Sequence, residues 1–228
     1  MMGWTLNPVV FGDYPEIMKK IAGSKIPSFT QSQSKQLKGS IDFLGLNHYV
    51  SAYIADEPND SQSGPRDYNA DISVRFTVSR NQTPSGQLIP FGIPVDPPGL
   101  QRVLEYFKQE YGNPPIYVQE NGYGSLFNGT LNDTARIDAI GGFIGAVLAA
   151  IRNGSNARGY IVWSFVDCFE LLWGYLSPYG IYHVDFEDRD RKRQPRLSAI
   201  WYRDFLMKKK QHLAIQSVGW LAASRTSR

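Results

Sequence analysis

The stretch Pro114-Pro115-Ile116-Tyr117-Val118-Gln119-Glu120-Asn121-Gly122 decides the fold. The two prolines end the element before them, and the residues from Ile116 to Val118 favour a β-strand. The run then delivers one carboxylate, that of Glu120, directly before an Asn-Gly turn. Parallel α/β folds place their chemistry at the carboxyl ends of strands, so Glu120 is a candidate catalytic residue. A cap for the next segment, or an ion-pair partner, is the alternative on this evidence alone.

Two further strands with helices behind them flank this stretch. Residues 41–49 predict a buried strand, and residues 159–164 predict a third strand. Helices are predicted over 99–111, with Leu100, Val103, Leu104 and Phe107 on one side, and over 134–152 and 195–208. Three strand–helix units in a row indicate an α/β fold with a parallel sheet. An eight-stranded (β/α)8 barrel needs ~250 residues or more, so the chain is expected to form part of a barrel.

The remaining segments show weaker patterns. Residues 3–14 are predicted to be irregular, and short helices are predicted from Pro15 to Ala22 and over 30–38, the latter capped by Thr30. Residues 51–98 are interpreted as a long loop with a short hairpin near 72–78, and loops of this length often form a wall of a binding site. An extended piece is predicted at 180–186, and the chain from residue 211 onward has no clear pattern.

Composition excludes several classes of function. The 228 residues are 42% hydrophobic and 20% charged, which is typical of a globular domain, and the net charge of +3 is too small to indicate nucleic-acid binding. One cysteine, Cys168, excludes an internal disulfide. The histidines His48, His183 and His212 lack metal-ligand spacing, so neither a metal nor a cofactor is expected. No apolar run reaches the ~18 residues of a membrane span, so no membrane partner is expected.

Asparagine-linked glycosylation motifs are more frequent than chance supplies. Five Asn-X-Ser/Thr sequons occur, at Asn59, Asn81, Asn128, Asn132 and Asn153. They indicate a protein of the secretory pathway, extracellular or vacuolar. Met1-Met2-Gly3-Trp4 does not resemble a signal peptide, so we expect the front of the protein to be absent from this chain.

Each predicted strand ends in groups suited to sugar recognition. They are Asn47 and Tyr49, which share one face of the first strand, then Glu120, then Trp163 with Glu170 in the loop that follows. Carboxylates and amides bind sugar hydroxyls, and an indole packs on the apolar face of a pyranose. The alternative for Trp163 is a core position, and for Glu170 a solvated loop.

Eight short segments, in the order of the family, resemble glycoside hydrolase family 1 and in particular its plant β-glucosidases. They are Gly12-Asp13-Tyr14-Pro15, Asp42-Phe43-Leu44-Gly45-Leu46-Asn47, Gln119-Glu120-Asn121-Gly122, Arg158-Gly159-Tyr160, Trp163-Ser164-Phe165, Phe169-Glu170, Gly174-Tyr175 and Tyr179-Gly180-Ile181-Tyr182. The resemblance runs from about Gly3 to Leu206. It implies that residues 1–228 form one partial (β/α)8 barrel domain with the last three strands and their helices, without strands one to five, and with an irregular tail over 211–228.

The resemblance also implies a reaction and a role for each strand-end residue. The substrate would be a β-glucoside, cleaved at its terminal glucosyl group with retention. Glu120 matches the nucleophile, and Tyr49 would hydrogen-bond and orient it. Asn47 would lie near the sugar 2-hydroxyl. Glu170 would bind hydroxyls on the far side of the ring, and Trp163 would form a platform beneath sugar and aglycone.

The sequence departs from the family in four respects. Leu171 stands where a second sugar-contacting Trp is frequent, while His48 and Cys168 replace a common Tyr and Asn. The acid/base motif Thr-x-Asn-Glu-Pro does not occur. A retaining enzyme needs both carboxyl groups, so this chain alone is expected to be inactive or strongly impaired. The alternative is a truncated, non-catalytic relative that binds sugar or pairs with a full-length relative.

Overall fold

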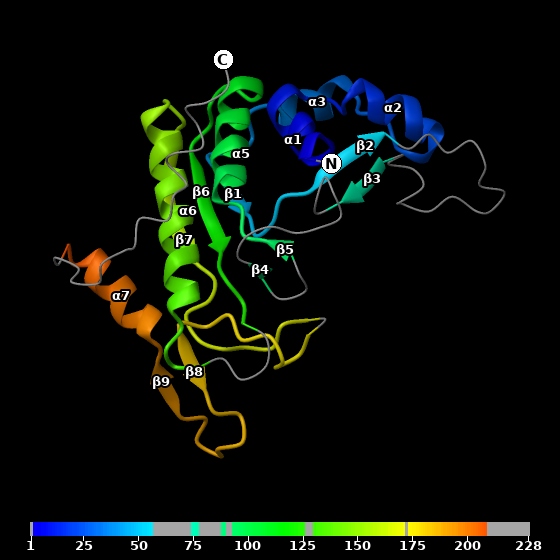
Figure 1. The fold of residues 1–228 in the computed structure, drawn as a ribbon. Helices are drawn as coiled ribbons and strands as arrows, with labels where there is room; N and C mark the ends of the chain where they lie inside the picture. The colour runs from blue at the N-terminus through cyan, green and yellow to red at the C-terminus, as the bar shows by residue number, and fades with distance from the viewer. Residues whose placement is uncertain are drawn as a thin grey trace.

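A three-stranded parallel sheet forms the centre of the computed structural model, which describes residues 2–56, 74–77, 88–89, 93–125, 130–171 and 173–208 (Figure 1). The strand order is β1 (Leu44–Asn47), β6 (Ile116–Asn121) and β7 (Ala157–Val162), with parallel pairing on both sides of β6. All three predicted strands are therefore confirmed, each shorter than or shifted from its predicted range. The stretch that includes Glu120 is the middle strand.

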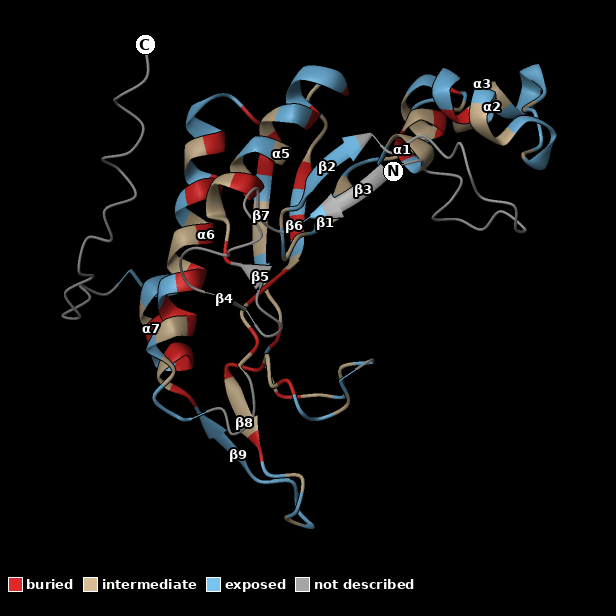
Figure 2. Ribbon diagram, turned by 45° about the vertical axis from the view of Figure 1, so that its right-hand side comes forward, coloured by how far each residue is buried: buried red, intermediate tan, exposed pale blue. Residues whose placement is uncertain are grey.

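Helices α5 (Pro97–Glu110) and α6 (Thr134–Arg152) cover one face of this sheet, and α7 (Leu197–Leu206) packs beside α6 (Figure 1). The predicted apolar side of α5 is confirmed, because Leu100 and Leu104 are fully buried. Buried residues lie where these helices meet one another and the sheet (Figure 2). By length and composition α6 could cross a membrane, but most of its buried side chains belong to the two apolar clusters of this core.

The second face of the sheet has a different environment. Along β6, Ile116 and Val118 are fully buried against the helices, whereas Tyr117 and Gln119 are exposed. The prediction that residues 41–49 form a buried strand is wrong in this respect, because β1 alternates between half-buried and exposed residues. The physical reason is that the described elements cover β1 on one face and pair with it along one edge.

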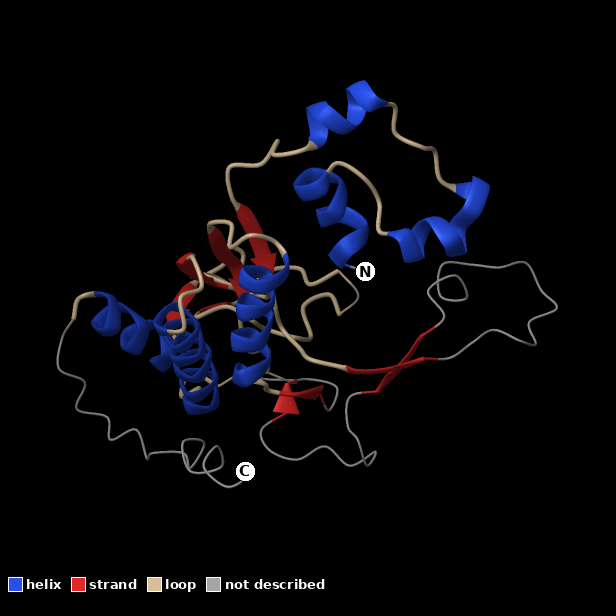
Figure 3. Cartoon of the chain, turned by 90° about the horizontal axis from the view of Figure 1, so that it is seen from above, coloured by secondary structure: helices blue, strands red, loops and turns tan. Residues whose placement is uncertain are grey.

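The N-terminal segment is helical where an irregular chain was predicted. Helix α1 (Met2–Phe11) forms although it contains Pro8, because Leu6 and Pro8 are buried and Val9 packs against the main core. Burial thus outweighs the poor helix propensity of proline. The two predicted short helices are confirmed as α2 (Glu16–Ala22) and α3 (Gln31–Leu37), with a 3-10 turn, η1 (Gly23–Lys25), after α2. The helices near the N-terminus form a group beside the sheet (Figure 3).

Three short antiparallel pairs complete the described structure. Strand β2 (Tyr53–Asp56) pairs with β3 (Val74–Thr77), and β4 (Leu88–Ile89) pairs with β5 (Ile93–Pro94). The predicted hairpin near 72–78 is therefore wrong in its partner, which is β2 and not an adjacent segment. The extended piece at 180–186 is confirmed as β8 (Tyr182–Val184), but it pairs with β9 (Arg193–Pro195). Pro195 thus ends a strand, and α7 begins two residues later than predicted; the segment from residue 211 lies outside the described residues.

Candidate active site at the strand ends

Glu120 and Tyr49 meet at the carboxyl ends of β6 and β1. Asn47 lies opposite Glu120 in the strand register, and the backbone N–H of His48 donates to the Glu120 carbonyl at 2.9 Å. This bond extends the ladder past the end of β1 and carries Tyr49 to the carboxylate. The Tyr49 hydroxyl donates to Glu120 Oε2 at 2.9 Å. Burial, and secondly Glu120, raise the pKa of Tyr49 far above its usual range, so the phenol keeps its proton and remains a donor.

Asn121 connects all three strands directly below this pair. Its side chain is fully buried; its amide Nδ2 donates to the His48 carbonyl at 2.6 Å, and its Oδ1 accepts from the Tyr160 hydroxyl at 2.5 Å. One amide therefore ties the end of β1 to β6 and to β7. The sequence placed Asn121 in a turn and in a segment that resembles the family, and no pattern in it signals that this side chain contacts all three strands.

Trp163 and Glu170 form a second pair after β7. The backbone N–H of Trp163 donates to the Asn121 carbonyl at 2.9 Å, which continues the same ladder. The indole Nε1–H donates to Glu170 Oε1 at 3.1 Å, and the Cys168 thiol donates to the same oxygen at 3.4 Å. The indole is half-buried and bonded to the carboxylate, so neither the core position for Trp163 nor the solvated loop for Glu170 describes what is found.

A close backbone approach joins the two pairs. A Cβ atom on Gly122 would lie 1.8 Å from the Trp163 carbonyl oxygen, so only glycine fits after Asn121 at this distance. The turn after Glu120 therefore passes directly over the start of the Trp163 loop. The carboxylates of Glu120 and Glu170 consequently come from two chain segments that touch at Gly122.

The sequence model described as glycosyl hydrolase family 1 matches residues 1–211. This chain belongs to glycosyl hydrolase family 1. Beta-glucosidase 22 of Oryza sativa subsp. japonica is 56% identical over 208 residues, which are 90% of this chain and 39% of that protein. A cyanidin 3-O-glucoside 7-O-glucosyltransferase (acyl-glucose) of Delphinium grandiflorum is 51% identical and covers 91% of this chain and 39% of its own length. The chain thus spans about two fifths of these relatives.

Solved family 1 structures superpose closely on this chain. A rice β-glucosidase crystal structure has a TM-score of 0.84 at 32% identity, covering 89% of this chain and 44% of that chain. A mutant of that rice β-glucosidase, solved in a covalent complex with glucose, has a TM-score of 0.83 at 32% identity, with the same coverages of 89% and 44%. The expected architecture is therefore confirmed as a partial TIM barrel, whose parallel sheet is β1-β6-β7.

The structure describes some of the other predicted site residues of this family 1 chain, and others lie outside the described residues. The Asn47 side chain is exposed at the end of β1, and Leu171 is 87% exposed beside Glu170. Of the sequons, Asn132 and Asn153 are exposed, while Asn59, Asn81 and Asn128 lie outside the described residues. Among the residues that the structure describes, no group of three or more His, Cys, Asp or Glu side chains has the arrangement of a metal site.

Proposed function

We propose that this chain carries the nucleophile side and part of the glucose-binding side of a retaining β-glucosidase site. The observation that carries the proposal is the 2.9 Å hydrogen bond from the Tyr49 hydroxyl to Glu120 Oε2 at the carboxyl ends of two parallel strands. A protonated phenol fixes the orientation of the carboxylate. It also occupies one carboxylate oxygen and leaves Oε1 for attack.

In the proposed reaction, Glu120 Oε1 attacks the anomeric carbon of a β-glucoside from below the ring. The bond from that carbon to the aglycone oxygen breaks, and a covalent glycosyl-enzyme ester forms. The departing oxygen takes up a proton as it leaves. A water molecule then attacks the same carbon and gives up a proton to a base or to solvent. The ester bond breaks, glucose leaves with net retention, and Glu120 returns to its carboxylate form.

The second pair would hold the sugar. The Trp163 indole offers an apolar face for the C–H side of the ring and fixes Glu170 through its N–H. The Glu170 carboxylate would accept hydrogen bonds from two neighbouring sugar hydroxyls. Asn47, opposite Glu120 in the register, would reach the 2-hydroxyl next to the anomeric carbon.

Protonation of the leaving group is the step for which the sequence contains no acid/base motif. Loss of a general acid costs on the order of 10²–10⁴-fold for a poor leaving group and little for an activated phenol. We therefore propose that this chain alone acts on activated glucosides, and that full activity needs the acid from residues beyond this chain. Pairing with a full-length relative is one source, and the exposed face of the sheet supports such pairing.

The test uses residues 1–228 and a dinitrophenyl β-glucoside, with intact-protein mass spectrometry after incubation with a 2-fluoro-glucosyl fluoride. We expect a burst of phenol and a mass increase of one fluoroglucosyl group. Glu120→Gln should abolish both, whereas Glu110→Gln, which alters an exposed carboxylate at the end of α5, should abolish neither. A folded protein with no burst and no adduct contradicts the proposal.

Transfer of glucose to a hydroxyl acceptor is a second candidate. The observation in its favour is the 51% identity to the Delphinium protein, whose name describes a glucosyltransferase. A glycosyl-enzyme on Glu120 can be released by an alcohol as well as by water. The ratio of methyl glucoside to glucose, measured with added methanol, separates the two reactions.

A further inference from the structure

The loop that carries Trp163 and Glu170 has little regular structure of its own. Between β7 and β8, the described residues form only two isolated bridges, Val166 with Tyr182 and Glu170 with Gly174. Loops without a ladder keep one conformation only where buried contacts hold them. The contacts that hold this loop therefore determine where Glu170 points.

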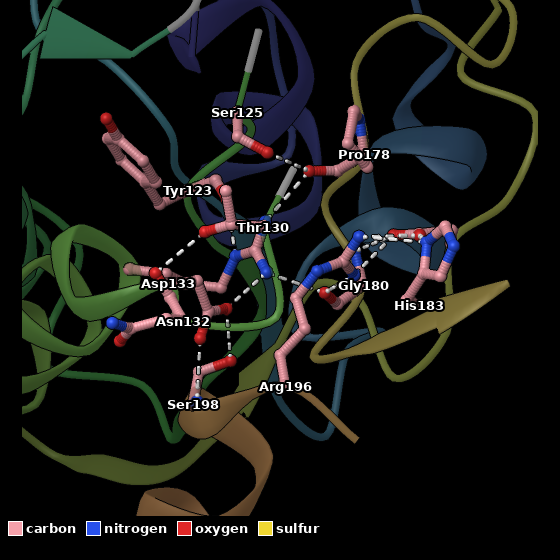
Figure 4. A network of polar contacts seen from close by, with 12 residues as sticks. Tyr123, Ser125, Thr130, Asn132, Asp133, Pro178, Gly180, His183, Arg196 and Ser198 are labelled. Atoms are coloured by element: carbon pink, nitrogen blue, oxygen red, sulfur yellow. Dashed lines mark hydrogen bonds and ion pairs between the residues drawn. The ribbon is translucent and has the colours of Figure 1, made fainter. Parts of the chain in front are cut away.

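Asp167 is the buried centre of these contacts. Three of the residues that it contacts, Gly180, His183 and Arg196, lie together in Figure 4. Its carboxylate takes both arms of the Arg196 guanidinium, at 2.9 Å for Oδ1 and 2.8 Å for Oδ2. The same carboxylate accepts the backbone N–H of Gly180 at 3.0 Å and that of Val184 at 3.2 Å. His183 Nδ1 lies 3.2 Å from Oδ2. The middle of the loop is thus bonded to its own far end and to Arg196.

Two buried arginines connect this loop to the helices. Arg196 immediately precedes α7, and Arg136 lies on α6; both side chains donate to the Gly180 carbonyl, at 2.6 Å and 2.7 Å. Arg136 also donates to the Pro178 carbonyl at 2.9 Å and to Asp133 at 2.6 Å. The end of the loop is therefore fixed to the same two helices that pack in the core.

The two arms of the loop are in direct contact at this point. A Cβ atom on Gly180 would lie 2.2 Å from the Asp167 nitrogen, so the arms touch backbone to backbone. Asp167 stands four residues after Trp163 and three before Glu170. A fixed Asp167 leaves only two residues, Cys168 and Phe169, between the anchor and the Glu170 carboxylate.

We propose that Asp167 and Arg196 are positioning residues, which hold the loop so that Glu170 meets the Trp163 indole. The reading of Glu170 as a sugar ligand rests on the proposed function, whereas the positioning itself does not. The planar guanidinium is essential to it, because it spans both carboxylate oxygens and the Gly180 carbonyl at once. A lysine ammonium keeps the charge but lacks this fork.

Cys168 is a natural reporter for this geometry, because it is the one cysteine in the chain and donates to Glu170 Oε1 at 3.4 Å. Burial, and then Glu170, raise the pKa of the Cys168 thiol from 9.0 to about 11; Asp167 also raises it and Ser164 lowers it. Alkylation requires the thiolate, so its rate at fixed pH reports whether Glu170 lies beside the thiol.

The experiment measures iodoacetamide alkylation at pH 8 in the full chain, with Glu170→Gln, Arg196→Lys and the double variant. In the parent chain, Glu170→Gln should accelerate alkylation several-fold because the neighbouring charge is removed. Arg196→Lys should accelerate it by up to about 100-fold, as the thiol pKa returns from about 11 toward 9.0. Adding Glu170→Gln to Arg196→Lys should then change nothing. Arg193→Lys, at an exposed arginine on β9, should match the parent.

An unchanged effect of Glu170→Gln in a folded Arg196→Lys background would overturn the proposal. Circular dichroism establishes whether that variant is folded. If it is not, alkylation of the parent chain in increasing, sub-denaturing urea decides the question. If the buried contact between Asp167 and Arg196 holds the loop, the alkylation rate of Cys168 should rise with urea as steeply as global unfolding does. An alkylation rate that does not depend on urea would overturn the proposal. The alkylation experiment does not require glucosidase activity, so its result stands even if the burst assay fails.

Discussion

Replacement of Asn121 by aspartate tests the link between the three strands. The fully buried amide donates to the His48 carbonyl at 2.6 Å and accepts from the Tyr160 hydroxyl at 2.5 Å. Asn121→Asp keeps the shape of the side chain and an acceptor for Tyr160. It also places a carboxylate oxygen against the His48 carbonyl oxygen, where a donor is needed.

The size of the effect depends on pH. Burial raises the pKa of the introduced carboxyl above the unfolded value of about 3.9. Its proton can donate to the His48 carbonyl, so little stability is lost below pH 4. The loss grows as pH rises from the unfolded to the folded pKa and is constant above it. A rise of two units corresponds to a full loss of about 2.7 kcal/mol, of which about 1.8 kcal/mol develops between pH 4.5 and pH 7.5.

The assay is urea unfolding followed by circular dichroism at pH 4.5 and pH 7.5, with the two-state criteria checked at each pH. Tyr160→Phe is the matched control, because it removes one hydrogen bond of the same amide without adding a titratable group. It should cost about 1 kcal/mol at both pH values. An Asn121→Asp variant that loses equal stability at both pH values would refute the link to the His48 carbonyl.

Three other substitutions test the site and the core. Tyr49→Phe should lower the burst rate on the activated glucoside by roughly 10–100-fold, because a hydrogen bond to a charged group contributes about 1.5–3 kcal/mol; an unchanged rate would contradict the orienting role. Gly122→Ala should disrupt the turn, since the new carbon would meet the Trp163 carbonyl at 1.8 Å, and should reduce the alkylation contrast produced by Glu170→Gln. Burial lowers the pKa of His48 below 6.5, so as pH falls through 6.5 the unfolded chain binds a proton that the folded chain does not, and the stability decreases. His48→Phe should therefore flatten the dependence of stability on pH between pH 7.5 and 5.5. An unaltered slope would exclude His48 as the source of this dependence.

The order of the three sheet strands and of the helices that follow them was predictable because each of these elements has a local signal. Runs of apolar, strand-favouring residues indicated the strands. Thr30 as a cap and Gly39 as a stop indicated α3, and in the structure Thr30 forms a complete capping box with Gln33. Helix α1 was missed because its stability comes from burial of Leu6 and Pro8 against distant residues. The partner of β3 was missed for the same reason, since register between distant strands has no local signal.

The strand-end rule led to the candidates Glu120, Tyr49 and Trp163 because it depends only on where a strand stops, and the structure places them at or just beyond the ends of β6, β1 and β7. It did not identify the residues that hold them. Asn121 bonds the His48 carbonyl across 73 residues of sequence, and Asp167 bonds Arg196 across 29. A buried polar side chain can be recognised as an anchor only when its partner is known, and the partner is a matter of tertiary structure.

The two anchors bear on whether the isolated chain builds its side of the site. Every partner of Asn121 and Asp167 described above lies within this chain, on strands, loops and helices of one packed core. The proposed nucleophile side is therefore organised from within, which favours a burst on an activated substrate. The sheet face beyond it is different, because Tyr117 is 38% and Ile161 is 55% exposed. Apolar side chains of this kind favour association, so recovery of activity on natural glucosides should depend on a partner that covers this face and supplies the acid. If the isolated chain shows the burst but no added family 1 barrel gives it activity on natural glucosides, the chain organises its own side of the site and the conclusion about the partner is wrong.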